Sequence, residues 1–381
     1  MTLKPIENRA MTGSTAARLS APDALRGLIM VLMALDHASL FIAHKHSTGE
    51  MWGGPYPVYT DSLAFLTRFV THFCAPGFFF LMGMGMALLA LSRQEQGWSQ
   101  WRIIRHLWIR SGVIMAIKFL VVNLAWEYGL YFGVLWALAG TMILSSLLLW
   151  LKPGHLLALA VVLLVGLELV TPGPAQWLTE MGWLTRILLA PGVLVSPAGK
   201  TILVSYYPVL PWLKLVVLGL AFGKWLAQDP RLGFSRAWKL GAALLAAFVL
   251  VRYLDGFGNI RPRTSDSWMD FLNPVKYPPS IAFTLMTTGV NLIALWLFSR
   301  AGAAAQNVLQ PLVVFGRAPL FLYVVHLFLY STLGDWLTPH GSRLVAMYPI
   351  WLLGLLILYP LCWGYRRLKH VQPARAVLQF L

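Results

Sequence analysis

The sequence predicts an all-α, polytopic membrane protein, a bundle of about ten transmembrane helices with both termini on the cytoplasmic side. Hydrophobic residues make up 58% of the 381 positions and charged residues only 12%, whereas a soluble domain carries about 25% charged residues. Apolar stretches of about 20 residues, the length that crosses a bilayer, recur along the chain. Lipid must therefore be the solvent for much of this apolar surface.

Ten apolar stretches are candidate spans, and one membrane domain contains them all. They cover residues 22–43, 67–91, 107–125, 130–151, 155–171, 203–226, 239–254, 280–299, 312–333 and 345–364. The predicted division of the chain is a polar cytoplasmic tail at 1–20, a transmembrane domain at 21–365 and a basic cytoplasmic tail at 366–381.

The distribution of Lys and Arg sets the predicted orientation. With the N-terminus in the cytoplasm, the cytoplasmic segments hold about twice as many basic residues as the opposite side, as expected for a membrane protein. The formal net charge of +16 comes from these short basic runs between spans. Because no basic stripe is interleaved with aromatic residues, nucleic acid is not an expected partner. Cys74 and Cys362 both lie in apolar segments, so a disulfide framework is not expected either.

The first span contains ionisable residues, which are costly in a membrane and mark functional positions by default. Asp23 and Arg26 are three residues apart, so they share a helix face and can form an ion pair. His37 follows Arg26 by eleven residues, which returns it to nearly the same face and places it about 16 Å deeper. Asp36 faces another direction and is expected to pair with a different span.

This spacing suits a CoA thioester. Arg26, near the cytoplasmic surface and paired with Asp23, would bind phosphate through charge-assisted hydrogen bonds while the pantetheine arm reaches inward. A neutral His37 would take the proton from an amine or hydroxyl that attacks the thioester, and Asp36 would stabilise the cationic histidine. The structural alternative is an ion pair at the start of the helix and a histidine that only packs and hydrogen-bonds.

Two further spans repeat the combination of arginine and histidine. Arg68 and His72 are four residues apart and share a helix face. His72 is a second candidate catalytic residue, with a structural hydrogen bond as an equally supported alternative, and Arg68 is a candidate acceptor ligand. Arg317 lies nine residues before His326, at the cytoplasmic end of its span, and is a candidate CoA ligand. His326, together with Lys276 in an external loop, is predicted to bind or orient the acceptor.

No metal is expected. His44 and His46 are the only paired candidates in a loop, and two ligands do not make a metal site. The chain also lacks a P-loop, a dinucleotide-binding motif, a His-Glu-x-x-His zinc motif and a nucleophile elbow.

Several of these segments, taken together and in order, resemble a known family. They are 23–27 (DALRG) with His37, 72–76 (HFCAP), 78–83 (FFFLMG), 207–212 (YPVLPW), 271–280 (FLNPVKYPPS) and 315–323 (FGRAPLFLY). The chain resembles the bacterial relatives of the heparan-alpha-glucosaminide N-acetyltransferase catalytic domain, within the transmembrane acyltransferase superfamily. The resemblance implies acetyl-CoA as co-substrate on the cytoplasmic side, a sugar acceptor, and a multi-pass protein of the bacterial inner membrane.

The resemblance also bears on the catalytic base. Membrane O-acyltransferases of the wider superfamily have their first-helix catalytic histidine at the position of His37, ten residues after Gly27. The lysosomal enzyme has asparagine there and an essential histidine in the following loop, where His44 and His46 do not match its local motif. His37 is therefore the predicted base.

The predicted function is an acetyl-CoA-dependent sugar N- or O-acetyltransferase. The alternative is a transporter or permease for a sugar or small anion, in which the same buried polar residues would line a substrate path. The absence of an inverted repeat and the position of the arginines at cytoplasmic span ends favour the enzyme. The sequence leaves the acceptor, the acyl chain length and a homo-oligomeric state open.

Overall fold

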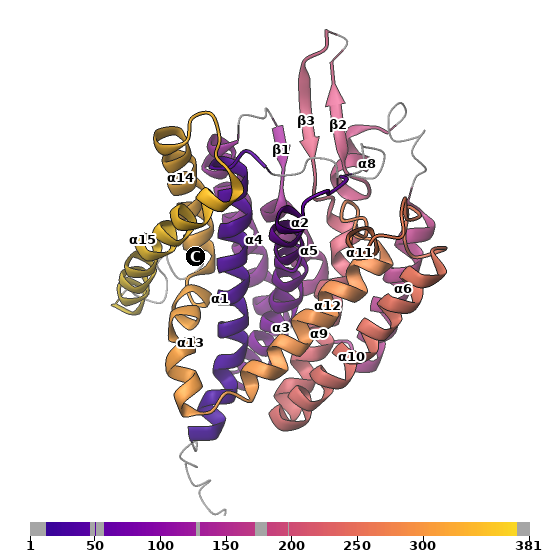
Figure 1. The fold of residues 1–381 in the computed structure, drawn as a ribbon. Helices are drawn as coiled ribbons and strands as arrows, with labels where there is room; N and C mark the ends of the chain where they lie inside the picture. The colour runs from indigo at the N-terminus through magenta and orange to yellow at the C-terminus, as the bar shows by residue number, and fades with distance from the viewer. Residues whose placement is uncertain are drawn as a thin grey trace, which may run out of the picture.

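The computed structural model describes residues 13–45, 50, 57–126, 130–171, 181–196 and 198–371. Most of these residues form helices that are joined by loops at two opposite ends of the molecule (Figure 1). The predicted tails as far as residue 12 and from residue 372 onward lie outside the described residues, as do His46 and residues 51–56. The division into two tails and a membrane domain stays a prediction.

Among the described residues, eight helical segments are long and apolar enough to cross a membrane. They are α1 (Gly13–Phe41), α2 with α3 (Ser62–Thr71 and Cys74–Glu95), α4 with the 3-10 turn η1 (Gln100–Leu120 and Val122–Ala125), α9 (Val209–Gln228), α10 (Pro230–Leu254), α12 (Ile281–Ser299), α14 (Pro319–Leu337) and α15 (Leu344–Val371). Two shorter apolar helices are α5 (Val134–Ser146) and α6 (Pro153–Leu169). Each of the ten predicted ranges thus overlaps a helix, although 130–151 and 203–226 begin in short strands. The all-α membrane fold is confirmed; the number of spans and the orientation of the termini stay predictions.

One predicted span, 312–333, contains parts of two helices. The helix α13 (Ala303–Gly316) ends before Arg317, and α14 begins at Pro319. Proline has no N–H to donate to the preceding turn and disfavours the helical conformation in the residue before it. Ala318 accordingly leaves the helical region, with φ −128° and ψ 47°. The sequence is apolar on both sides of this break, with Arg317 as the one charged residue within 312–333, so hydrophobicity alone did not reveal it.

A small three-stranded sheet, which the sequence did not predict, lies at the end of the molecule opposite the start of α1 (Figure 1). Its strands are β1 (Leu130–Phe132), β2 (Gly192–Val195) and β3 (Thr201–Ser205). The order is β1-β3-β2, with β1 parallel and β2 antiparallel to β3. Two short helices, α8 (Trp183–Leu188) and α11 (Trp268–Phe271), lie in the connections of this end.

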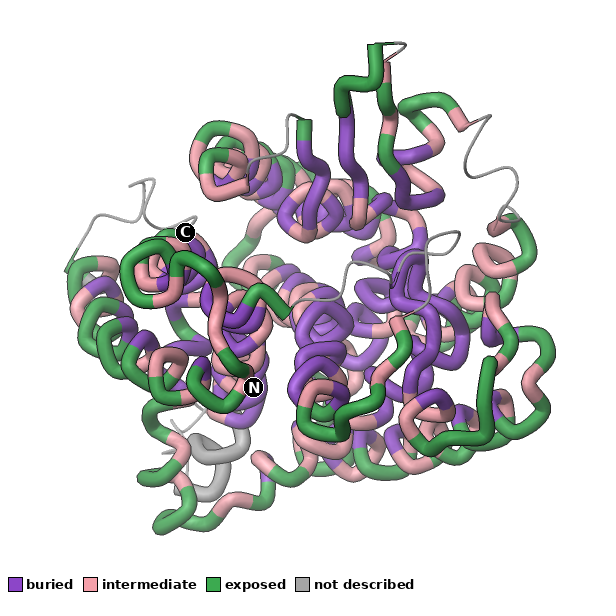
Figure 2. Tube along the Cα trace, turned by 45° about the horizontal axis from the view of Figure 1, so that its top comes forward, coloured by how far each residue is buried: buried purple, intermediate pink, exposed green. Residues whose placement is uncertain are grey.

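The helices differ in how far they are buried. In the most apolar 18-residue window of α9, 78% of the residues are buried, against 17% for α15 and 22% for α10. Buried residues gather in the middle of the bundle and exposed ones at its periphery (Figure 2). The first helix, α1, packs against α2, α3, α12, α13, α14 and α15, so its side chains reach the centre of the bundle.

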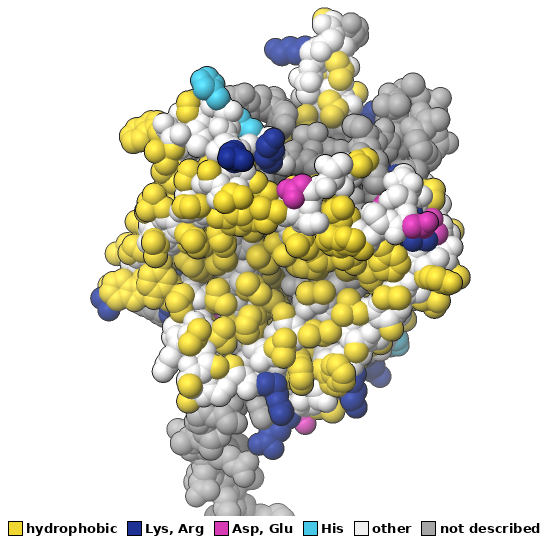
Figure 3. Space-filling model, in the orientation of Figure 1, with side chains coloured by type: hydrophobic (Ala, Val, Ile, Leu, Met, Phe, Trp, Pro, Cys, Tyr) yellow, Lys and Arg dark blue, Asp and Glu magenta, His cyan; other side chains and the backbone are white. Residues whose placement is uncertain are grey.

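A broad hydrophobic surface covers the face of the molecule seen in Figure 3, between two more polar ends. It includes large apolar side chains that are more than half exposed, among them Val345, Leu356 and Leu250. A soluble monomer rarely exposes a continuous apolar surface of this extent. The chain is therefore a multi-pass membrane protein with lipid around its outer helices.

Two glycines bring α1 and α13 into direct backbone contact. A Cβ atom added at Gly27 would lie 1.8 Å from the carbonyl oxygen of Leu312, and one added at Gly316 would lie 1.8 Å from that of Asp23. Any larger residue would therefore collide with backbone. The close approach also places Arg26 beside α13, where its Nη1 donates a 3.0 Å hydrogen bond to the carbonyl oxygen of Gly316.

We expect Gly27→Ala to destabilise the protein by about 1–3 kcal/mol, because α1 and α13 must separate to admit the methyl group. The control is Gly112→Ala on α4, where an added Cβ meets no atom within 4 Å. There alanine should be neutral or stabilising, since it favours the helix over glycine by about 0.5–1 kcal/mol. Thermal unfolding of the two variants in detergent measures the difference, and equal stabilities would contradict the close-contact argument.

Candidate active site

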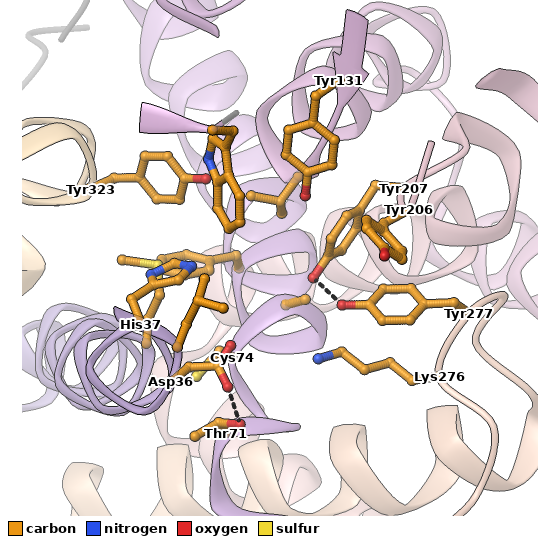
Figure 4. A pocket seen from close by; sticks show the side chains of 16 residues that line it. Asp36, His37, Thr71, Cys74, Tyr131, Tyr206, Tyr207, Lys276, Tyr277 and Tyr323 are labelled. Carbon is orange, nitrogen blue, oxygen red and sulfur yellow. Dashed lines mark hydrogen bonds between the residues drawn. The ribbon is translucent and has the colours of Figure 1, made fainter. Parts of the chain in front are cut away.

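A partly open cavity with about 930 Å³ of empty space, including space open to solvent, lies beside the buried face of α1. Sixteen residues line it (Figure 4). Its polar lining includes Asp36 and His37 from α1, Thr71 and Cys74 at the α2–α3 junction, and Lys276 from the loop before α12. The aromatic lining residues are Phe78, Trp126, Tyr131, Tyr206, Tyr207, Tyr277 and Tyr323.

His37 pairs directly with His326 of α14. Its Nδ1 lies 2.6 Å from Nε2 of His326, and Nδ1 of His326 lies 2.9 Å from the carbonyl oxygen of Leu322. A carbonyl can only accept, so Nδ1 of His326 carries the proton that it donates to Leu322. With both rings neutral, Nε2 of His326 then accepts from Nδ1–H of His37. The basic nitrogen of His37 is therefore Nε2.

A buried cluster of charges lies next to this pair. Arg68 forms ion pairs with both Asp36 and Glu50. Nε2 of His72 lies 2.9 Å from Oε1 of Glu50, and Nζ of Lys276 lies 3.9 Å from Oε2 of the same carboxylate. Two acidic and two basic side chains therefore balance, with His72 hydrogen-bonded at the edge of the cluster. Asp36 pairs with another span, as its direction on the helix predicted.

The protonation of two loop residues in this cluster follows from their surroundings. Burial raises the pKa of the Glu50 carboxyl, but the neighbouring cations, led by Arg68, outweigh it and hold the pKa well below its usual range. Burial and the charge of Arg68 lower the pKa of Lys276. Glu50 is consequently a carboxylate at neutral pH and provides the counter-charge for the ammonium group of Lys276 at the cavity wall.

The far wall of the cavity is built from tyrosines. The hydroxyl of Tyr277 donates to that of Tyr207 over 3.0 Å, and Figure 4 shows this pair facing the side of His37 and Asp36. Burial raises the pKa of both hydroxyls, so both stay protonated at neutral pH. Aromatic faces with a few polar groups between them are typical of a small-molecule site.

The loop that carries Lys276 and Tyr277 is held by the buried Lys214 and the half-buried Glu168. Nζ of Lys214, on α9, donates to the carbonyl oxygen of Pro279 over 2.7 Å. Oε2 of Glu168, on α6, accepts from the backbone N–H of Ile281 over 2.6 Å, at the start of α12. These contacts fix the segment immediately after the two lining residues against the bundle.

A second cavity adjoins the first. It contains about 1240 Å³ of empty space and shares the lining residues Phe78, Val134 and Tyr323 with the first cavity. Most of its lining residues are apolar side chains from α3, α4, α5 and α14. The largely apolar second cavity thus adjoins the polar, aromatic first cavity at the shared residues.

Basic side chains lie at the other end of the second cavity, namely Arg26, Arg110, Arg317 and Lys369. Asp23 connects two of them, with Oδ1 3.1 Å from Nη1 of Arg26 and Oδ2 2.7 Å from Nε of Arg317. Nε of Arg110 is buried and has no hydrogen-bond partner among the described residues. The positive charge of this end exceeds what Asp23 neutralises, which suits an anionic ligand.

The predicted residues thus fall into three places. Asp36, His37 and Lys276 line the first cavity, and Arg26 and Arg317 line the second. The others lie behind these walls: His326 against His37, Asp23 between two arginines, and Arg68 and His72 in the charge cluster around Glu50.

The sequence analysis missed Glu50, Arg110, Lys369 and the tyrosine wall. Glu50 lies in a loop of mixed composition. The sequence carried only an indirect signal for it: two buried cations need carboxylates as partners, and the chain has 14 acidic residues to provide them. Arg110 and Lys369 were assigned to the orienting charges at the ends of spans. Among the described residues, no three His, Cys, Asp or Glu side chains are grouped so that they could bind a metal.

Comparison with known proteins gives one match. The sequence model of a family described as heparan-alpha-glucosaminide N-acetyltransferase, catalytic, matches residues 18–253, which is more than half of the chain. This range includes His37 and the charge cluster apart from Lys276, and it ends before Arg317 and His326. A search of curated proteins found no match.

Proposed function

The chain belongs to the heparan-alpha-glucosaminide N-acetyltransferase catalytic family, and from this premise we propose that it transfers an acetyl group from cytoplasmic acetyl-CoA to a sugar acceptor, either an amino sugar or a sugar hydroxyl. The observation that carries the proposal is that a cavity lined by basic side chains adjoins the cavity lined by His37, with three lining residues in common. A CoA thioester has the same order of parts: charged phosphates, a narrow flexible arm and a reactive carbonyl.

The donor occupies the second cavity in this proposal. The guanidinium groups of Arg26, Arg110 and Arg317 bind the phosphates through charge-assisted hydrogen bonds, and Lys369 adds a further positive charge. The pantetheine arm lies along the apolar section between α3, α5 and α14. The thioester then reaches the residues shared by both cavities, next to His37.

The acceptor occupies the first cavity, among the tyrosines and Lys276. Nε2 of His37 takes the proton of the acceptor amine or hydroxyl as that group attacks the thioester carbonyl carbon. The C–S bond then breaks, the CoA sulfur leaves, and the proton on His37 returns to it. His326 accepts the Nδ1–H of His37 and thereby fixes the tautomer and supports the cationic ring.

The charge cluster has a positioning role in the proposed mechanism. Arg68 and Thr71 hold the carboxylate of Asp36, with Oγ1 of Thr71 donating to Asp36 Oδ1 over 2.8 Å. Asp36 lies beside His37 and favours its cationic state. His72 acts through Glu50, which in turn orients Lys276 toward the acceptor.

The testing experiment is acetyl transfer by purified protein in detergent. Acetyl-CoA labelled on the acetyl group is offered with a panel of amino sugars and neutral sugars, and label on each acceptor is measured with release of free CoA. Transfer to a sugar supports the proposal and separates amine from hydroxyl acceptors. Sugar uptake into sealed proteoliposomes without consumption of acetyl-CoA would instead support the transporter.

We expect Arg110→Gln to raise the KM for acetyl-CoA by about 10-fold with little change in kcat, because it removes a charged hydrogen bond that is the same in the bound and transition states. Steady-state kinetics at varied acetyl-CoA measure both constants. Arg105→Gln is the control, since Arg105 is an exposed residue of the same helix that does not line the cavity. A fall in kcat at unchanged KM would contradict a donor-binding role.

A further inference from the structure

A third cavity lies between the first turns of α10 and the end of α12. It contains about 590 Å³ of empty space, and we call it the α10–α12 cavity. It is lined by Arg231, Phe234, Ser235, Trp296, Ser299 and Arg300. None of these residues lines either cavity of the candidate active site, so this is a separate feature of the molecule.

The polar side of the α10–α12 cavity is positively charged. Arg231 and Arg300 both line it, and neither side chain forms an ion pair within the described part of the chain. Asp229 is the nearest acid in the sequence, but one of its oxygens accepts from the backbone N–H groups of Arg231 and Leu232, over 2.8 and 3.2 Å. Two guanidinium groups and the hydroxyl of Ser235 are thus available to one anionic group.

The other side of the cavity is apolar and continues onto the outer surface of the helices. Phe234 is buried at its wall, and the ring of Trp296 lies 5.7 Å from that of Trp238. Trp238 is 45% exposed and Leu297 55% exposed, on two of the helices that contribute to the hydrophobic surface. In Figure 3, basic side chains gather below this surface, at the end of the molecule where α10 begins in Figure 1.

We propose that the α10–α12 cavity binds the phosphate of an anionic phospholipid. Arginine matches phosphate through paired N–H donors, and basic pockets between membrane helices are suited to lipid headgroups. A free phosphate would use the arginines alone, whereas a lipid also covers the exposed apolar side chains beside them. Because the cavity has two arginines and also adjoins exposed apolar side chains, an amphipathic phospholipid fits it better than a free phosphate.

Occupancy of the cavity would tie α10 to α12. The two helices already approach closely at Gly241 and Gly289, where a Cβ added at Gly241 would lie 2.9 Å from the Gly289 carbonyl oxygen. A ligand that binds only the folded arrangement stabilises it, and the stabilisation rises with the logarithm of the ligand concentration once this exceeds the Kd. The lipid is therefore expected to raise the thermal stability of the protein, independently of any acetyl transfer.

The test compares two double variants of the full chain in detergent. Arg231→Gln with Arg300→Gln removes the two cavity cations, and Arg236→Gln with Lys239→Gln removes the same net charge from α10 outside the cavity lining. Native mass spectrometry and thermal unfolding are recorded with added phosphatidylglycerol, phosphatidylcholine or inorganic phosphate. We expect phosphatidylglycerol to bind and stabilise the natural sequence and the control, and to bind the cavity variant about 10-fold more weakly.

Three outcomes would overturn the proposal. Equal binding of phosphatidylglycerol and phosphatidylcholine would show that charge does not select the ligand. Equal loss of binding in the two double variants would show that general surface charge, and not the cavity, attracts the lipid. Stabilisation by inorganic phosphate to the same extent as by phosphatidylglycerol would identify a phosphate site without a lipid.

Discussion

Replacing His37 with alanine is expected to lower kcat for acetyl transfer by about 100- to 10,000-fold, the usual contribution of a general base. His37 lines the cavity. It is hydrogen-bonded to His326, which in turn donates to the carbonyl oxygen of Leu322, and this arrangement leaves Nε2 as the basic nitrogen of His37. The variant should still fold and bind CoA, because the basic end of the second cavity is unchanged. Transfer kinetics and CoA binding by calorimetry measure the two effects separately.

The control for this variant is His155→Ala, which removes an exposed histidine from α6 and should leave kcat unchanged. His326→Gln tests the pairing: the double variant with His37→Ala should lose no more activity than His37→Ala alone, because residues that act as a unit are not additive. Full activity in His37→Ala would refute the assignment. Additive losses would place His326 in a separate role, such as acceptor binding.

Replacing Arg68 with alanine is expected to destabilise the protein by about 3–5 kcal/mol, the cost of leaving buried charges without their partner. Asp36 and Glu50 would both lose their main counter-charge inside the bundle. Unfolding in detergent, followed by heat or denaturant, measures the change. Arg105→Ala, an exposed arginine of α4, should change stability little.

A second variant separates the ion pair from simple packing. In Arg68→Met with Glu50→Gln both partners of the Arg68–Glu50 pair are neutral, so the loss should be smaller than the sum of the two single losses. If the two single losses simply add, the pair does not couple and the cluster argument fails. Activity is also expected to fall in Arg68→Ala, because Asp36 and the loop with Lys276 lose their orientation.

The sequence by itself determined the membrane fold and the positions of nearly all spans. A bilayer requires every backbone polar group to be satisfied within the segment, so helices of about 20 apolar residues are the solution for such a chain. The helical period also predicted that Arg26 and His37 share one face of the helix. It predicted in the same way that Asp36 points away from that face. These features depend on local geometry, which the sequence specifies directly.

Only the tertiary structure decided which residues meet. His326 lies 289 positions after His37 and contacts it because α1 and α14 pack together. Glu50 becomes the centre of the charge cluster because its carboxylate meets Arg68 and Lys276, which come from other parts of the chain. The contact of Gly27 with α13 likewise follows from packing between helices. Hydrophobicity and period carry no information on the partner of a buried group, since that partner is selected by the packing of distant segments.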